Sequence, residues 1–185
     1  MLGLLGEFSQ QVALTGEHSC GIRIVDFETQ QPMNWLLGHT SDISQINVCP
    51  EQPWLLASAS LDGTAKLWDL RSGLCTLTLL DKSDGPIKAL APLVDGGQPF
   101  CFTGGADESV KCWDVRAARC LYELATGNNN AEHMLWHGPS RSLLVCTECS
   151  HIDRDGFEYG YQMEYDREEE DEWEWPDARH TTLAW

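Results

Sequence analysis

The chain has 185 residues, 42% of them hydrophobic, and carries 29 Asp and Glu against 12 Lys and Arg, a net charge of −17. That length is enough for about one domain with a hydrophobic core. The acidic balance argues against nucleic acid and against an anionic membrane surface, since both are bound through clustered Lys and Arg. It is compatible with basic protein partners.

Eight cysteines are scattered along the chain, mostly within apolar runs such as residues 99–102. Residues 1–7 lack the basic start and the apolar stretch of a signal peptide. We therefore expect reduced thiols in an intracellular protein of the cytoplasm, the nucleus or both. No apolar run approaches the ~20 residues that a membrane helix needs.

In chain order, three segments repeat one pattern at residues 12–27, 55–71 and 100–116. Each has a β-rich run, a tight polar turn and a second β-rich run that ends in an aspartate. These aspartates, Asp26, Asp69 and Asp114, are separated by 43 and 45 residues. The repetition predicts an all-β chain built from similar units.

The middle unit shows the pattern most completely. Residues 43–48 are expected to form its innermost strand, and residues 55–60, small or apolar on both faces, a strand buried between neighbouring units. Residues 61–64 combine Asp and Gly in a turn, so residues 65–68 return antiparallel. Residues 74–80 are then expected to form the outer strand.

At this point the sequence resembles a known family. The stretch LLGHTSDISQINVCPEQPWLLASASLDGTAKLWDLRSG is similar to a complete WD40 repeat, and the resemblance covers roughly residues 10–150. It implies a β-propeller that binds other proteins without catalysis. Because a closed propeller has ~4–8 blades, about three and a half blades predict an all-β partial propeller arc.

The expected domain boundaries follow from these repeats. The propeller spans residues 1–150, and the last segment, residues 151–185, holds 12 acidic and 3 basic residues and is expected to be disordered. Residues 145–161 resemble a region of uncharacterised fungal WD40-repeat proteins in which the acidic run is an insertion. The expected blades comprise residues 1–38 (partial), 39–80 (full), 81–124 (full) and 125–150 (partial, with strands at 131–136 and 142–146).

The resemblance also implies a buried hydrogen-bond network, which in the family joins a His, a Ser or Thr, an Asp and a Trp. The matching positions of the second blade are His39, Ser60, Asp62 and Trp68. The third blade keeps Asp107 and Trp113, with Gly105 at the Ser position. A catalytic triad of His39, Asp62 and Ser60 is the alternative, but the repeat already accounts for all three residues.

Two surfaces are candidates for partner binding. The first is the propeller top, formed by loops around Thr40, Asp42 and Asp84. The second is the edge at Arg71 and Arg116, which end two Trp-Asp-x-Arg motifs. An Arg at that place is similar to the signature of substrate receptors of cullin-type ubiquitin ligases, although many repeats without that role carry it.

Two further features suggest other functions. Cys146, Cys149 and His151, with His133 and His137 upstream, suggest zinc and a metal-dependent enzyme, but Cys146 and Cys149 would point to opposite faces of one strand. We therefore predict neither a metal nor another cofactor. The acidic run at residues 168–172, with two Trp nearby, is either a solvated insertion or a landing site for a basic partner such as a histone tail.

Overall fold

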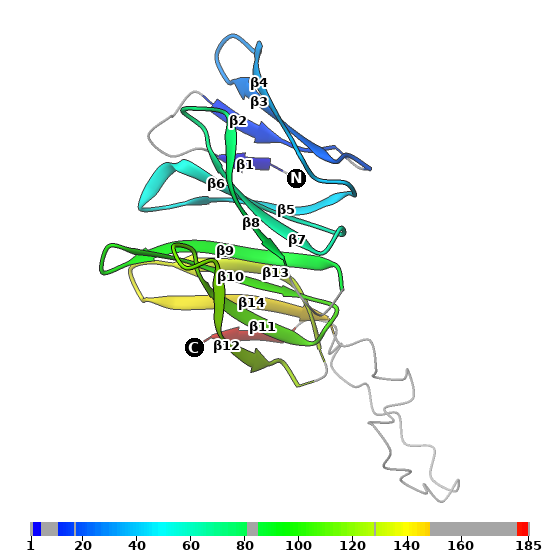
Figure 1. Cartoon of the computed structure of the whole chain (residues 1–185), viewed down its shortest axis with the longest axis vertical. Helices are drawn as coiled ribbons and strands as arrows, with labels where there is room; N and C mark the ends of the chain where they lie inside the picture. Colours follow the sequence, from blue (N-terminus) through cyan, green and yellow to red (C-terminus); the bar gives the residue numbers. More distant parts are fainter. Residues whose placement is uncertain are drawn as a thin grey trace, which may run out of the picture.

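The computed structural model describes residues 2–4, 11–16, 18–80, 85–127, 129–148 and 181–184, and the regular structure in these ranges is entirely β-strand. The strands form four separate antiparallel sheets, which we call blades 1 to 4 (Figure 1). Within each blade the spatial order of the strands follows the chain. No helix in these ranges is long and apolar enough to span a membrane.

Three blades have four strands and one has three. Blade 1 contains β1 (Leu2–Leu4), β2 (Gln11–Leu14), β3 (Gly21–Asp26) and β4 (Pro32–Leu37). Blade 2 contains β5 (Ile43–Cys49), β6 (Gln52–Ser60), β7 (Thr64–Asp69) and β8 (Leu74–Leu80). Blade 3 contains β9 (Ile87–Asp95), β10 (Gln98–Gly105), β11 (Ser109–Asp114) and β12 (Arg119–Ala125). Blade 4 contains β13 (Asn130–His137), β14 (Ser142–Glu148) and β15 (Thr181–Ala184).

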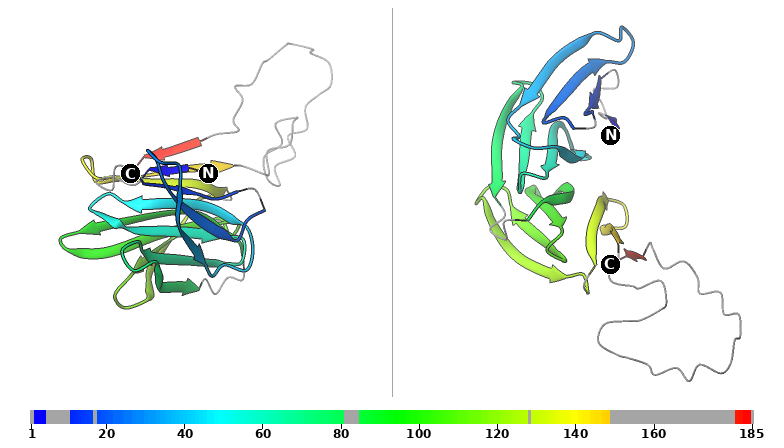
Figure 2. Two further views of the ribbon diagram at one scale, coloured as in Figure 1. Left: turned by 90° about the horizontal axis from the view of Figure 1, so that it is seen from above. Right: turned by 90° about the vertical axis from the view of Figure 1, so that its right-hand side faces the viewer.

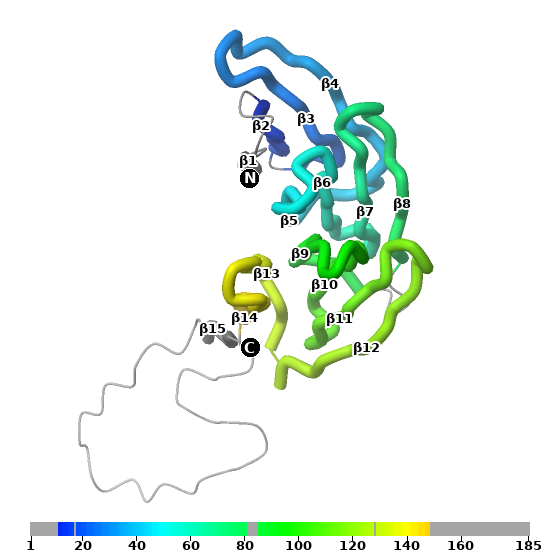
Figure 3. Tube along the Cα trace, turned by 90° about the vertical axis from the view of Figure 1, so that its left-hand side faces the viewer, coloured from blue at the N-terminus to red at the C-terminus, as the bar shows by residue number. Residues whose placement is uncertain are grey.

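The blades stack side by side into an open arc. The right-hand view of Figure 2 and the trace in Figure 3 show β5, β9 and β13 on the inner side and β4, β8 and β12 on the outer side. The inner strands β1, β5, β9 and β13 contact one another in sequence. The all-β partial propeller predicted from the sequence is thereby confirmed.

A separate hydrophobic cluster fills each junction between blades. Ala13, Ile22 and Leu36 of blade 1 meet Leu56 and Trp68 of blade 2. The next two junctions are built in the same way, around Leu79 with Trp113 between blades 2 and 3, and around Phe102 with Met134 between blades 3 and 4. Each blade therefore buries its apolar faces only against its neighbours, as stacked repeats do.

The strands also repeat in local detail. In blades 1, 2 and 3 the pairing of the third strand with the fourth shifts register at the same place, after Ile24, Leu67 and Cys112. Each of these residues stands two positions before the aspartate that ends its unit. The turn in the middle unit uses Gly63 at φ 77°, a conformation that other residues adopt only with strain.

The structure changes the predicted boundaries near the C-terminus. Residues 181–184, assigned from sequence to the acidic segment, form β15 and pair antiparallel with β14 from Leu144↔Ala184 to Thr147↔Thr181. The acidic run at residues 168–172 therefore stands in the sequence between two strands of blade 4. The predicted disorder of residues 151–180 lies outside the described residues.

Candidate functional site: a loop at the rim of the second blade

The candidate site is the loop at residues 40–42, which joins β4 to β5 and which we call the rim loop. It lies beside the turn at residues 61–63 between β6 and β7. Thr40 is exposed, whereas Asp42 is only partly exposed. The rim loop contains two of the three residues that the sequence placed on the propeller top; the third, Asp84, lies outside the described residues.

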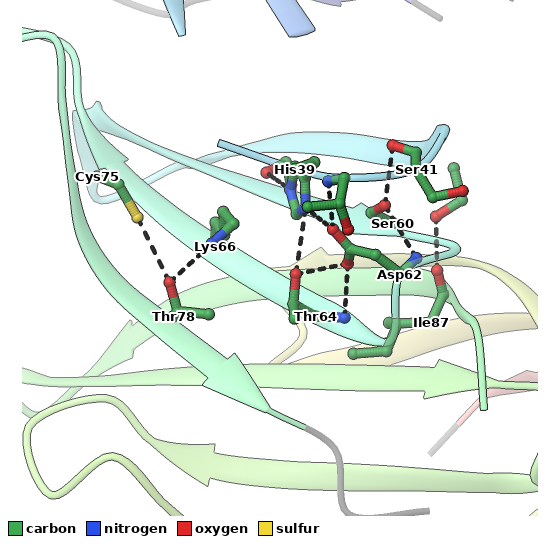
Figure 4. A network of polar contacts seen from close by, with 12 residues as sticks. His39, Ser41, Ser60, Asp62, Thr64, Lys66, Cys75, Thr78 and Ile87 are labelled. Carbon is green, nitrogen blue, oxygen red and sulfur yellow. Dashed lines mark hydrogen bonds and ion pairs between the residues drawn. The ribbon is translucent and has the colours of Figure 1, made fainter. Parts of the chain in front are cut away.

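A buried chain of hydrogen bonds runs beneath this loop. Trp68 Nε1 donates to Ser58 Oγ at 2.8 Å, and Ser58 Oγ lies 2.7 Å from His39 Nε2. His39 Nδ1 lies 3.0 Å from Asp62 Oδ2. Because an indole nitrogen only donates, the Ser58 hydroxyl is left to donate to His39, which donates in turn from Nδ1 to Asp62. Figure 4 shows His39 and Asp62 facing each other, with Thr64 beside them.

The hydroxyl in this chain belongs to Ser58, which corrects the assignment of Ser60. Strand register explains the difference, because Trp68 pairs with Leu56 and its ring reaches the diagonal neighbour Ser58 on the same face. Ser60 stands two residues further along, at the turn. There it donates to the carbonyl of Ser41 at 3.2 Å and accepts from the Asp62 N–H at 3.1 Å.

Asp62 is the electrostatic centre of the site. Burial raises its pKa, but hydrogen bonds from Thr64, Thr40 and His39 outweigh burial and lower the pKa to about 2. Burial lowers the pKa of His39, and its hydrogen bond to Asp62 offsets only part of that effect. At neutral pH the site therefore holds one carboxylate and a neutral imidazole.

The same residues hold the rim loop in place. The Thr40 N–H donates to Asp62 Oδ2 at 2.9 Å, and the Leu61 N–H donates to the carbonyl of Asp42 at 2.9 Å. From blade 1, His18 Nδ1 lies 3.0 Å from Asp42 Oδ2. Ser60 adds its bond to Ser41 (Figure 4). The loop is thus fixed by its backbone, while the Thr40 side chain stays open to solvent.

Blade 3 has a corresponding set of buried polar contacts, made by different residues. Trp113 Nε1 donates to Thr103 Oγ1 at 2.7 Å, so Thr103 takes the place of Ser58. Asp107 is paired with Lys111, whose Nζ lies 2.5 Å from Oδ2. Sequence reasoning kept Asp107 and Trp113 but missed Lys111, although its position three residues before the terminal aspartate matches that of Lys66 in blade 2.

Gly105 is glycine for a steric reason. A Cβ at this position would lie 2.1 Å from the carbonyl oxygen of Pro86. Gly105 corresponds to Ser60, so the sequence-based placement of Gly105 at the network position is corrected together with that of Ser60. No side chain of any kind fits there without movement of the backbone.

A second buried polar arrangement crosses three blades, and no motif in the sequence signals it. Gln45 on β5 donates to the carbonyl of Met134 at 2.8 Å and accepts from the N–H of Leu90 at 3.0 Å and of Met134 at 3.3 Å. Asn47 donates to the carbonyls of Leu90 and Met134 at 2.7 and 3.0 Å. We call Gln45 and Asn47 the amide clasp, because they join β5 to β9 and β13.

Arg71 and Arg116, the arginines of the second predicted surface, differ in how their guanidinium groups are hydrogen-bonded. Nε and Nη2 of Arg71 donate to Asp69 at 2.9 and 2.6 Å, and its guanidinium lies 5.0 Å from the Trp54 ring centroid. Arg116 donates from Nη2 to the carbonyl of Gly97 at 3.1 Å. The charged end of Arg71 is therefore already engaged within blade 2, although its side chain is exposed.

The geometry also bears on the two catalytic alternatives. Ser60 makes its bonds to Ser41 and Asp62, and the serine at His39 is the fully buried Ser58, so the described residues place no solvent-accessible serine beside this imidazole. Within the described ranges no three His, Cys, Asp or Glu side chains gather as a metal site. His133 and Cys146 face each other across β13 and β14. Cys149 and His151 lie outside the described residues.

Known proteins resemble this chain over the same repeated units. The family model described as "WD domain, G-beta repeat" matches residues 30–69 and 73–114. Coatomer subunit beta'-2 of Arabidopsis thaliana is 30% identical over 100 residues, which cover 54% of this chain and 11% of that protein. Nuclear distribution protein nudF of Aspergillus niger is 30% identical over 105 residues, covering 57% and 23%. F-box/WD repeat-containing protein sel-10 of Caenorhabditis elegans is 29% identical over 150 residues, covering 77% and 24%. The chain thus spans less than a quarter of the length of each of these three relatives.

Proposed function

We propose, from the premise that this chain carries WD40 repeats, that it is a non-catalytic scaffold for protein–protein interaction whose rim loop contacts the partner. WD40 repeats are generally interaction units and not catalytic ones. The observation that carries the proposal is the rim loop itself. Its backbone is anchored at Thr40, Ser41 and Asp42 by hydrogen bonds to Asp62, Ser60 and Leu61 of blade 2, yet the Thr40 side chain is open to solvent.

Pre-organisation is what makes such a loop suitable for binding. A loop that is already fixed loses little conformational entropy when a partner docks, so more of the contact energy remains as affinity. Next to the loop, Leu61 is 44% exposed and offers an apolar contact. Thr40 and the partly exposed Asp42, whose carbonyl accepts from the Leu61 N–H, add polar groups to the same region. Interfaces combine an apolar centre with polar groups in this way.

Substitution on the rim tests this proposal. Thr40→Arg and Leu61→Arg chains would be compared with wild type in affinity capture from cell extract, with quantitative mass spectrometry as the readout. Leu74→Arg is the matched control, because Leu74 is likewise an exposed leucine but begins the outer strand β8. We expect a defined set of proteins to be lost with both rim variants and kept with the control. Equal recovery by all four chains would contradict the proposal.

A ubiquitin-ligase substrate receptor is the second candidate, favoured by the similarity to a protein whose name combines an F-box with WD repeats. Its proposed contacts are Arg71 and Arg116. The internal pairing of Arg71 with Asp69 weighs against it, because a partner would have to compete for the same nitrogens. Arg71→Ala with Arg116→Ala should abolish co-purification of ligase subunits if this candidate holds, and unchanged recovery would reject it.

Two remaining proposals rest on the sequence alone. The acidic run at residues 168–172 is proposed as a contact for a basic protein, and its residues lie outside the described ranges. An intracellular location is proposed from the thiols; none of the seven described cysteines forms a disulfide, and Cys49, Cys101 and Cys112 are buried. Burial raises the pKa of Cys101 to about 12 and of Cys49 to about 11, so both thiols are unreactive at neutral pH.

A further inference from the structure

The carboxylate of Asp42 is only half engaged within the protein. Its Oδ2 lies 3.0 Å from Nδ1 of His18 on blade 1, and within the described ranges no donor is bonded to Oδ1. The side chain is 38% exposed, so a partner can reach this carboxylate from solvent. The backbone of Asp42 has a separate task, because its carbonyl anchors the rim loop by accepting from the Leu61 N–H.

A second carboxylate lies beneath the same loop. Asp62 accepts from the Thr40 N–H at 2.9 Å, and its other described partners are the backbone and hydroxyl of Thr64 and the imidazole of His39. Burial lowers the pKa of His39, so the groups bonded to Asp62 are neutral at neutral pH. Its charge is held by dipoles alone, and a charge that is partly buried acts over a longer distance than one in water.

The basic residues of blade 2 are directed away from the rim loop. Figure 4 shows Lys66 turned toward Thr78 on the outer strand β8, to which its Nζ donates at 2.9 Å. Arg71 is bonded to Asp69, at the opposite end of β7 from the turn that holds Asp62. The two carboxylates therefore make the surface potential at the rim loop negative.

An apolar side chain stands beside the exposed carboxylate. The hydrogen bond from the Leu61 N–H to the Asp42 carbonyl measures 2.9 Å and holds the two residues next to each other. Leu61 is 44% exposed. One short segment of a partner can thus contact an apolar group and an anionic group at the same time.

We infer that the rim loop binds a protein segment in which a Lys or Arg stands next to an apolar residue, with the basic side chain on Asp42 and the apolar one on Leu61. The inference rests on the proposed scaffold function and names the chemistry of its partner. Opposite charges across an interface speed association and exclude partners of the same charge. His18 already orients the carboxylate, so little freedom is lost when the cation binds.

The test begins with random peptides displayed on phage and selected against the 185-residue chain. Peptides that also bind the Thr40→Trp chain are removed first, because this substitution blocks the loop without a change in charge. We expect the remaining peptides to share a Lys or Arg next to an apolar residue. Remaining peptides without a basic residue would overturn the inference and leave the scaffold function standing, whereas the absence of any remaining peptide would contradict both.

Asp42→Asn measures what the charge contributes. The loop is anchored by the backbone carbonyl of this residue, so hydrogen exchange at the Leu61 amide should stay as in wild type. A selected peptide should bind Asp42→Asn at least about tenfold more weakly, because one partner of an interfacial charge pair is lost. Asp95→Asn is the matched control, since Asp95 is 49% exposed, also has one oxygen engaged, with Arg141, and ends β9. Equal affinity for the two variants would overturn the inference.

A double-mutant cycle shows whether the two charges meet. Replacing the basic residue of the peptide by Gln should weaken binding to wild type at least about tenfold and should leave binding to Asp42→Asn almost unchanged. All chains keep the acidic run at residues 168–172, so its attraction for the peptide is the same in each. Losses that add independently would place the basic residue elsewhere than on Asp42 and would overturn the inference.

Discussion

At the scale of single residues, the Ser58 hydroxyl links the buried tryptophan and histidine of the second blade. Its oxygen accepts from Trp68 and its proton goes to His39, and all three side chains are buried. Ser58→Ala leaves two buried groups unpaired, so we expect it to lower the free energy of unfolding by about 1–3 kcal/mol. Urea unfolding followed by Trp fluorescence measures this change.

Ser60→Ala is the matched comparison for Ser58→Ala. It removes only the bonds to the carbonyl of Ser41 and from the N–H of Asp62, both at the edge of the turn. We expect it to be milder than Ser58→Ala and to act mainly on exchange of the amide hydrogens around the rim loop. A larger loss of stability from Ser60→Ala would return the network role to Ser60.

The pH dependence of stability follows from His39 and Asp62. Unfolded His39 takes up a proton near its ordinary pKa of 6.5, while the folded imidazole resists protonation, so stability should decrease as pH falls below about 6.5. The pKa of Asp62 is near 3.8 in the unfolded chain and about 2 in the folded one, so its stabilisation is lost between about pH 4 and 2.

Variants separate these two losses. Urea unfolding across pH should show a smaller loss below about pH 6.5 in His39→Gln than in wild type, and a smaller loss between about pH 4 and 2 in Asp62→Asn. Parallel curves for wild type and both variants would show that neither group carries the predicted linkage.

At the scale of elements, the amide clasp ties three inner strands together. Gln45→Leu removes the acceptor of the Leu90 and Met134 N–H groups. We expect hydrogen exchange at these two amides to accelerate at least about tenfold, even though Met134 is 89 residues away in sequence. Gln98→Leu, an exposed glutamine on β10, is the control and should change neither amide. Unchanged exchange in Gln45→Leu would mean that the clasp does not hold the strands.

The end of β10 offers a steric prediction. Gly105→Ala places a Cβ against the Pro86 carbonyl and should lower the free energy of unfolding by about 1–3 kcal/mol. Gly85→Ala is the control, because no heavy atom lies within 4 Å of a Cβ added there. Thermal unfolding of both variants measures the difference, and an equal Tm for the two would contradict the close approach of Gly105 to Pro86.

The sequence predicted the elements of the second and third blades well because their hairpins carry turn residues at fixed distances from Asp69 and Asp114. The sequence did not identify residues whose role depends on how the strands pair. Ser58 and Ser60 are both buried serines on one face of β6, and only the pairing of Trp68 with Leu56 distinguishes them. β15 was missed because an acidic run separates it from β14. The amide clasp was missed because a glutamine and an asparagine on one strand form no recognisable motif.

At the scale of the whole molecule, the arc of four blades supports the fixed rim loop. The buried chain from Trp68 to Asp62 anchors this loop from below, and Trp68 itself packs in the junction between blades 1 and 2. The rim loop is therefore coupled to the packing of the two blades on which it stands.

The most direct test of the central claim is a photo-reactive amino acid placed at Thr40 of the rim loop, with the same group at Leu74 on β8 as the comparison. Cross-linking in cells followed by mass spectrometry identifies what lies against each position. The scaffold account predicts specific protein adducts at position 40 that are absent at position 74. Adducts at position 74 alone, or the same adducts at both positions, would contradict it.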